Sequence, residues 1–316
     1  MLVLTSCKVK SKIREHVTKS YPNIRFQFCP NIDEAESYLP EAEVLITYGE
    51  DLTNKHIEQA KQLKWIMVIS AGLDQMPFEA IEEKGILVTN ARGIHSIPMA
   101  EYAIAMLLQV CRQSKQLIAH EQQHIWDRKV QMTEISGKTM LVLGTGAIGQ
   151  EAARLGKAFR MKTIGISKSG KRTPHFDEVG TSKDILSYLP EADFVIGVLP
   201  STPETYKWIG KEHFETMKED AVFLNMGRGT TVDEEALLQA LQQKKIHHAV
   251  LDVFEQEPLD GDHPFWDMDN VTVTPHLSGI SPQYQPRAFD IFKDNLNTYI
   301  KGETDFINIV DPKRGY

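Results

Sequence analysis

The sequence is poor in cysteine, and its few cysteines form no pattern. Cys7, Cys29 and Cys111 lie far apart in a chain of 316 residues, and none belongs to a Cys-x-x-Cys pair. Disulfide-stapled domains and structural zinc sites need several cysteines at paired spacings. The cysteine content therefore argues against a disulfide framework and against a metal site, and it fits a reducing compartment.

The chain also lacks long apolar runs, internal repeats and an excess of positive charge. Its apolar start is too short for a signal peptide and has no basic residues before it. No stretch approaches the roughly 20 apolar residues that cross a bilayer. The formal net charge of −8 argues against nucleic acid as a partner. We expect a cytoplasmic protein that binds neither membranes nor nucleic acids.

What the sequence contains is an alternation of short β-rich runs and helical patterns. A chain of 316 residues exceeds what one hydrophobic core usually supports, so two domains are expected. The βαβ order predicts an α/β fold made of two doubly wound, parallel-sheet (Rossmann-like) domains. Strands are predicted at 2–5, 24–28, 43–47, 64–69, 86–89, 139–143, 162–167, 193–199, 221–225, 247–253 and 271–274.

The longest apolar helical stretch, 98–118, is predicted to be one helix joining the two α/β units. The amphipathic helix at 286–300 is expected to return to the first unit.

A glycine-rich turn follows the strand at 139–143. The run Gly144-Thr145-Gly146-Ala147-Ile148-Gly149 matches G-x-G-x-x-G and opens a helix that leads to a second strand. In this motif Gly144 permits the tight turn, Gly146 lets backbone approach a pyrophosphate, and Gly149 lets the helix pack on the sheet. A glycine turn without a ligand is the alternative, but the surrounding strand–helix–strand order favours dinucleotide binding at the helix N-terminus.

The end of that second strand indicates which dinucleotide is preferred. NAD-binding proteins usually place an acidic residue there for the ribose 2′-hydroxyl. This chain has Ser167-Lys168-Ser169-Gly170-Lys171-Arg172, with no carboxylate and three cations. A solvated basic turn is the alternative. We predict NADP as the cofactor, with NAD possible, and leave open which cation contacts the 2′-phosphate.

Three polar residues follow the last three strands of the second unit. Each of Arg228, Glu257 and His276 alone fits a surface or structural role as well as a functional one. Together they favour function, because ligands of doubly wound folds bind outside the carboxyl ends of the strands.

The three side chains suit the reduction of a 2-keto acid. Negative charge grows on the carbonyl oxygen as hydride reaches the carbon, so a proton donor must stand within reach, and His276 is the candidate. A nearby carboxylate, Glu257, would favour the charged imidazole. Arg228 would orient the substrate through a forked contact and stabilise the developing oxyanion.

These motifs resemble those of the D-isomer-specific 2-hydroxyacid dehydrogenases over nearly the whole chain. The 29-residue spacing from Arg228 to Glu257 also fits that family. The resemblance rests on the glycine turn, the three residues above, and the runs Ser70-Ala71-Gly72-Leu73-Asp74, Asn90-Ala91-Arg92-Gly93, Met99-Ala100-Glu101 and Leu199-Pro200-Ser201-Thr202.

The resemblance implies a cofactor domain inserted into a split substrate domain. The substrate-binding domain would comprise 1–97 and 283–316, and the dinucleotide-binding domain 98–282. A homodimer is expected through 98–135, which includes Trp126.

The same resemblance implies further contacts. The backbone N–H groups of Ala71 and Gly72 would bind the substrate carboxylate. Asp252 would hold the nicotinamide carboxamide. Leu199, Pro200 and Thr205 would line the adenosine side.

Departures from the family pattern narrow the activity. Leu277-Ser278-Gly279 and the following Ser281-Pro282-x-Tyr284 resemble a subgroup that reduces a broad range of 2-keto acids, including glyoxylate and hydroxypyruvate. The chain does not resemble phosphoglycerate dehydrogenases with an added regulatory domain, and Glu257 argues against formate dehydrogenase activity. A nucleotide-sensing corepressor on the same fold is the alternative function.

Overall fold

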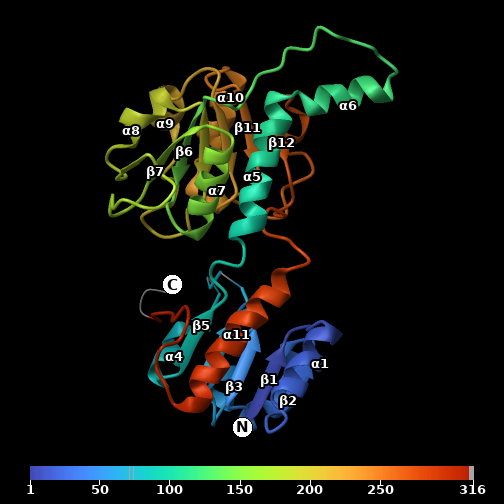
Figure 1. The fold of residues 1–316 in the computed structure, drawn as a ribbon, viewed down its shortest axis with the longest axis vertical. Helices are drawn as coiled ribbons and strands as arrows, with labels where there is room; N and C mark the ends of the chain where they lie inside the picture. Colours follow the sequence, from blue (N-terminus) through green and yellow to red (C-terminus); the bar gives the residue numbers. More distant parts are fainter. Residues whose placement is uncertain (71, 74, 313–316) are drawn as a thin grey trace. The chain divides into compact units, whose positions relative to one another are not determined.

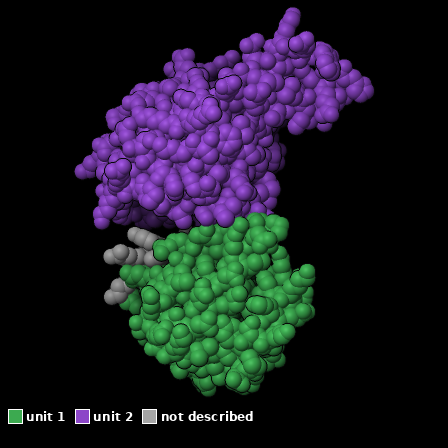
Figure 2. Space-filling model, in the orientation of Figure 1, with its two compact units in different colours: residues 1–95, 281–316 green, residues 96–280 purple. Residues whose placement is uncertain are grey.

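The computed structural model describes residues 1–70, 72–73 and 75–312 and contains two compact units. Unit 1 combines residues 1–95 with 281–316, so it is discontinuous, and unit 2 comprises residues 96–280 (Figure 2). None of the described helices is both long enough and apolar enough to span a membrane.

Unit 1 is built on a five-stranded parallel sheet in the order β2-β1-β3-β4-β5 (Figure 1). Its strands are β1 (Leu2–Ser6), β2 (Arg25–Cys29), β3 (Val44–Thr47), β4 (Trp65–Val68) and β5 (Leu87–Asn90). Its helices are α1 (Ser11–Ser20), α2 (Ile32–Ala35), the 3₁₀ turn η1 (Glu36–Glu41), α3 (Asn54–Gln59), α4 (Phe78–Glu83) and α11 (Tyr284–Lys301).

Alternate residues of each central strand of unit 1 face different layers, as parallel sheets require. In β4, Ile66 and Val68 pack toward α3 and α4. Trp65 and Met67 pack toward α1 and α11. The Trp65 ring stacks on Phe292 of α11 at 5.5 Å between centroids, so the C-terminal helix completes the core of the N-terminal sheet, as the sequence predicted.

Unit 2 is built on a seven-stranded parallel sheet in the order β12-β11-β10-β9-β6-β7-β8. The strands are β6 (Thr139–Leu143), β7 (Lys162–Ile166), β8 (Glu178–Gly180), β9 (Phe194–Gly197), β10 (Val222–Asn225), β11 (His248–Leu251) and β12 (Val271–Val273). The order reverses between β6 and β9, which is the switch point where doubly wound folds bind nucleotides.

Helices cover both faces of this sheet as well. Leu141 and Leu143 of β6 point to one layer, and Met140 and Val142 point to the other. The first layer holds α8 (Ile185–Tyr188), η2 (Leu189–Glu191), α9 (Lys211–Thr216) and α10 (Glu234–Gln242). The second holds α5 (Ser96–Cys111) and α7 (Ala147–Ala158), and the turns η3 (Gly229–Thr231) and η4 (Pro264–Asp267) connect strands. Two α/β units with wholly parallel sheets confirm the predicted fold class.

The prediction of one helix over 98–118 is wrong. Helix α5 ends at Cys111, and a separate helix α6 (Ser114–Gln122) begins after Gln113, whose φ of 54° is left-handed. The Cys111 carbonyl accepts a hydrogen bond from Thr133 N–H at 2.9 Å, so the returning chain terminates the helix. Helix α6 has no buried residue and extends away from the rest of unit 2 (Figure 1).

Candidate active site

The predicted catalytic residues follow three neighbouring strands of unit 2. Strands β10, β11 and β12 pair in parallel, so their carboxyl ends lie at one edge of the sheet. Arg228 comes three residues after β10 ends, Glu257 six after β11, and His276 three after β12. The topology therefore places the three residues at one edge of the sheet, although up to 48 positions separate them in the sequence.

Glu257 and His276 form a hydrogen-bonded pair. Glu257 Oε2 lies 2.8 Å from His276 Nδ1, and both side chains are partly exposed, at 37% and 51%. The second carboxylate oxygen accepts a hydrogen bond from Phe254 N–H at 3.0 Å. The carboxylate is thus fixed at one oxygen and fixes the imidazole at the other, which leaves Nε2 as the ring nitrogen able to meet a ligand.

The backbone that carries His276 is held in an uncommon conformation. His276 has a φ of 54°, in the left-handed region that few residues other than glycine adopt. Its N–H donates to the carbonyl of Asp252 at 2.9 Å. The Asp252 carboxylate, which is fully buried, accepts from Leu277 N–H and Ser278 N–H, each at 2.9 Å. Sequence reasoning missed this support, since no local pattern shows which backbone a buried aspartate will reach.

Arg228 stands where two loops pack closely. A Cβ on Gly227 would lie 2.6 Å from the Leu199 carbonyl oxygen, and one on Gly229 would lie 1.9 Å from the Phe254 carbonyl carbon. Only glycines fit on either side, which explains the Gly-Arg-Gly sequence. Arg228 is half-buried, its Nη1 donates to Gly227 O at 2.9 Å, and its own carbonyl accepts from Asn225 and Thr231 side chains.

The glycine turn has the features expected of a pyrophosphate site. Gly144 has a φ of +113°, and a Cβ on Gly149 would lie 1.9 Å from the Gly144 carbonyl oxygen, so both positions require glycine. A Cβ on Gly146 would meet nothing within 4 Å, which leaves the turn open on that side. Helix α7 has no acidic residue in its first turn, so its N–H groups and dipole remain available to an anion. These residues fit a dinucleotide.

The predicted NADP turn follows β7. Ser167 is half-buried, and its Oγ accepts from Gly170 N–H at 3.1 Å, which closes the turn. Lys168, Ser169 and Arg172 are exposed, and Lys168 and Arg172 make no ion pair with a residue that the structure describes. The turn therefore presents hydroxyls and cations to solvent, and their contacts with a cofactor stay a prediction.

The residues expected on the adenosine side form one short loop after β9. Thr205 Oγ1 donates to Pro200 O at 2.6 Å and accepts from Thr202 N–H at 2.9 Å. Leu199 packs partly against the core of unit 2. The loop is thus ordered by its own hydrogen bonds, and its role toward adenosine stays a prediction.

The residues expected to bind the substrate carboxylate belong to unit 1. Ala71 lies outside the described residues. Gly72 N–H donates to Ser70 Oγ at 3.2 Å, so this amide has an internal partner. The assignment of both residues stays a prediction.

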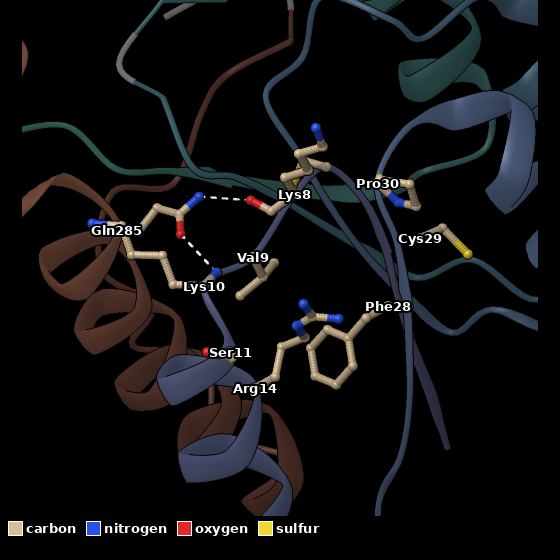
Figure 3. Close-up of a pocket in the computed structure, with 10 residues that line it drawn as sticks. Lys8, Val9, Lys10, Ser11, Arg14, Phe28, Cys29, Pro30 and Gln285 are labelled. Carbon is tan, nitrogen blue, oxygen red and sulfur yellow. Dashed lines mark hydrogen bonds between the residues drawn. The ribbon is translucent and has the colours of Figure 1, made fainter.

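A separate pocket of about 510 Å³ in unit 1 contains none of the predicted site residues. It lies at the carboxyl ends of β1 and β2, where Lys10, Arg14 and Gln285 are grouped around it (Figure 3). Its lysines and arginine are exposed, and Gln285 bridges Lys10 N–H and the Lys8 carbonyl. Among the described residues, no group of three or more His, Cys, Asp or Glu side chains could hold a metal ion.

Comparison with protein families matches residues 104–278 to the NAD-binding domain of the D-isomer specific 2-hydroxyacid dehydrogenases. The chain is 36% identical over 274 residues to D-3-phosphoglycerate dehydrogenase of Methanocaldococcus jannaschii, covering 86% of this chain and 52% of that protein. It therefore spans about half the length of that relative. Glyoxylate reductase of Thermococcus litoralis is 33% identical over 273 residues, covering 83% of this chain and 82% of that one.

Solved structures give the same grouping. A D-isomer specific 2-hydroxyacid dehydrogenase family protein from Aeromonas salmonicida superposes with a TM-score of 0.89 at 32% identity, covering 98% of this chain and 99% of the other. The NADPH-dependent glyoxylate/hydroxypyruvate reductase of Sinorhizobium meliloti, in complex with NADP and sulfate, superposes with a TM-score of 0.82 at 26% identity, covering 100% and 99%.

Proposed function

This chain belongs to the D-isomer specific 2-hydroxyacid dehydrogenase family, and from that membership we propose that it reduces small 2-keto acids to D-2-hydroxy acids with NADPH. The observation that carries the proposal is the 2.8 Å pair of Glu257 and His276 at the same sheet edge as Arg228. A glyoxylate or hydroxypyruvate type of activity is favoured by the glyoxylate reductase relative and by the S. meliloti reductase. The corepressor alternative has no comparable support.

The chain's own residues handle the proton and the charge. A bound nicotinamide cofactor supplies the hydride that reduces the carbonyl carbon. His276, held at Nδ1 by Glu257, donates the proton to the carbonyl oxygen from Nε2. Glu257 stabilises the imidazolium by its opposite charge, and Arg228 orients the substrate and stabilises negative charge on the oxygen.

NADPH is the proposed reductant because of what stands after β7. The turn offers the hydroxyl of Ser167 and exposed cations, and has no carboxylate to repel a 2′-phosphate. The NADP complex of the S. meliloti reductase supports the same choice. In this proposal unit 2 binds the dinucleotide, and unit 1 is the substrate-binding domain.

The enzyme is also proposed to be a cytoplasmic homodimer that pairs through the arm formed by α6 and residues 123–135. Trp126 in this arm is 91% exposed, Ile118 is 54% exposed and Ile125 is 47% exposed. Apolar patches of this kind mark association surfaces. A reducing compartment is supported by three buried cysteines without disulfides, Cys7, Cys29 and Cys111.

The proposal is tested by measuring the oxidation of NADPH and of NADH in the presence of a panel of keto acids. The change in nicotinamide absorbance gives the rate. The panel comprises glyoxylate, hydroxypyruvate, pyruvate, a branched keto acid and 3-phosphohydroxypyruvate, and the configuration of each chiral product is determined. We expect turnover with the small unphosphorylated acids and D products. Tight binding of NADPH without turnover of any keto acid would instead favour a nucleotide sensor.

A further inference from the structure

Three side chains that support the segment carrying the proposed acid–base histidine are joined by a continuous series of hydrogen bonds. Tyr102 of α5 bonds through its hydroxyl to Thr274 Oγ1 at 2.7 Å, and Thr274 Oγ1 donates to Asp252 Oδ1 at 2.5 Å. Thr274 and Tyr102 are partly buried, and Asp252 is fully buried. All three belong to unit 2, so these hydrogen bonds link its first helix to the end of the β12 edge strand.

The direction of these hydrogen bonds is determined by Asp252. Both of its oxygens face donors, namely Thr274 Oγ1 and Leu277 N–H at Oδ1 and Ser278 N–H at Oδ2. Because the one hydroxyl proton of Thr274 goes to Asp252, Tyr102 must donate to Thr274. Burial raises the pKa of Tyr102, so its hydroxyl keeps the proton that this role requires.

The Asp252 carboxylate in turn fixes the backbone on either side of the histidine. The amides it receives belong to the two residues after His276, and its own carbonyl receives the His276 amide at 2.9 Å. These contacts hold His276 at its left-handed φ of 54°. Oδ2 keeps room for one more donor, so a contact with a nicotinamide carboxamide is compatible with this arrangement.

We propose that Tyr102 and Thr274 are positioning residues that act through Asp252 to hold His276 in register for proton donation. The role rests on the proposed function, since it is defined by the reaction of His276. Small displacements of a catalytic group lower rates steeply, and a shift of about 1 Å can cost about 100-fold. Neither residue needs to touch substrate or cofactor for this effect.

Thr274→Val tests the proposal because valine keeps the shape of threonine and removes both hydrogen bonds. We expect kcat to fall about 10- to 100-fold while the KM for NADPH stays within about twofold. Hydrogen exchange of the segment 274–280, followed by mass spectrometry without any cofactor, should become faster. Thr274→Ser keeps the hydroxyl and should restore both measurements. Tyr102→Phe should produce a smaller fall in kcat, since Asp252 keeps its Thr274 donor.

Thr272→Val is the matched control. Thr272 lies two residues earlier, within β12, and is buried, and its hydroxyl bonds to His248 Nε2 at 2.9 Å rather than to Asp252. This variant should leave kcat and exchange at 274–280 unchanged even where it lowers stability. The proposal is overturned if Thr274→Val matches wild type in both measurements, or if Thr272→Val reproduces its defects. Exchange decides the structural link even if no keto acid is reduced.

Discussion

At the scale of single residues, the two nitrogens of the His276 imidazole have different roles. One is bound by a supporting carboxylate, and the other is available to donate a proton. Nδ1 meets Glu257 at 2.8 Å, while Nε2 makes no hydrogen bond to a described residue. A ring held at one nitrogen has a defined orientation for the other, which is what a proton donor needs.

Replacing His276 with Ala should lower kcat by about two to four orders of magnitude, the usual contribution of a positioned proton donor. Cofactor affinity, measured by NADPH fluorescence titration, should change little. The exposed histidine His16 on α1 offers a control, and His16→Ala should retain wild-type turnover. Near-normal turnover in the His276 variant would refute its role.

Glu257→Gln should weaken the imidazolium, because a neutral amide replaces the carboxylate beside Nδ1. The variant keeps the shape of the side chain but loses the charge that stabilises the protonated ring, so kcat for keto acid reduction should fall by about tenfold or more. The measurement is kcat for one keto acid at a fixed pH. Glu255→Gln, which removes the charge from an exposed pair with Lys207, should leave kcat unchanged. An unchanged kcat in Glu257→Gln would show that the carboxylate does not support proton donation.

The ratio of kcat/KM for NADPH and NADH should favour NADPH in the wild type by about tenfold to a few hundredfold, since charged hydrogen bonds contribute about 1.5–3 kcal/mol each before exposure reduces them. Ser167→Asp should shift the ratio toward NADH. An aspartate can still accept from Gly170 N–H, as Ser167 does at 3.1 Å, while it repels a phosphate. A wild type that prefers NADH would mean that the basic turn is only a solvated surface.

The sequence identified the candidate site residues, but it did not identify the contacts that hold them in place. Residues that end neighbouring parallel strands must meet at one edge, so the meeting of Glu257 and His276 follows from strand order. The hydroxyl of Tyr102 reaches Thr274 across 172 positions of the chain, and no spacing rule predicts such a contact. The glycines on either side of Arg228 indicated close packing there, but the sequence did not indicate which loops pack against them.

At the scale of elements, periodicity predicted where strands lie but not why a helix stops. The apolar pattern continues past Cys111 to Leu117 and Ile118, yet these two side chains are 38% and 54% exposed. Apolar periodicity predicts that one face of a helix is covered. It does not predict whether the covering surface belongs to the same chain or to another molecule. The three-residue strand β8 was missed because Glu178–Gly180 is too short to show alternation.

Strand β11 and the edge strand β12 are joined by a buried histidine, His248, that should make stability depend on pH. Burial, followed by the positive charges of Lys115 and His247, lowers the pKa of His248 to about 3. The unfolded chain, with an ordinary histidine, takes up a proton near pH 6.5, and the folded state does not until about pH 3. Stability contributed by His248 is therefore complete above pH 6.5 and is lost as pH falls toward 3.

Between pH 7 and pH 5, this histidine should cost the wild type about 1–2 kcal/mol of unfolding free energy. His248→Gln, which can still bond to Thr272, should show a correspondingly smaller loss in urea denaturation at the two pH values. His247→Gln, at the exposed neighbouring position, should lose nearly as much as wild type, because burial is the larger cause of the low pKa of His248. Equal losses in His248→Gln and wild type would show that His248 is not buried in its neutral form.

At the scale of the whole molecule, unit 1 is formed by two segments that lie far apart in the sequence, and the sequence pattern indicated that they would come together. The C-terminal helix α11 carries Phe289 and Phe292 into the core of the N-terminal sheet, and its amphipathic pattern indicated that it needed such a partner. Ala71 lies outside the described residues, so the contact between its N–H group and the substrate carboxylate stays a prediction.

Trp126→Ala in the arm should weaken or abolish the proposed homodimer, because it removes the largest exposed apolar side chain of that surface. Light scattering after size exclusion should give twice the chain mass of 35.8 kDa for wild type and a shift toward the single mass for the variant. Trp266→Ala, which removes an indole 49% exposed elsewhere on unit 2, is the control and should remain dimeric. A monomeric wild type would end the dimer proposal.

The exposure of Trp126 also gives the protein an intrinsic optical signal. The chain has only four tryptophans, and of these Trp65 is fully buried while Trp126 is 91% exposed. An indole that leaves water for an apolar contact emits at shorter wavelength. If pairing covers the arm, dilution of the unlabelled protein should shift its fluorescence to the red, and the midpoint of that shift would measure the affinity of one copy for another.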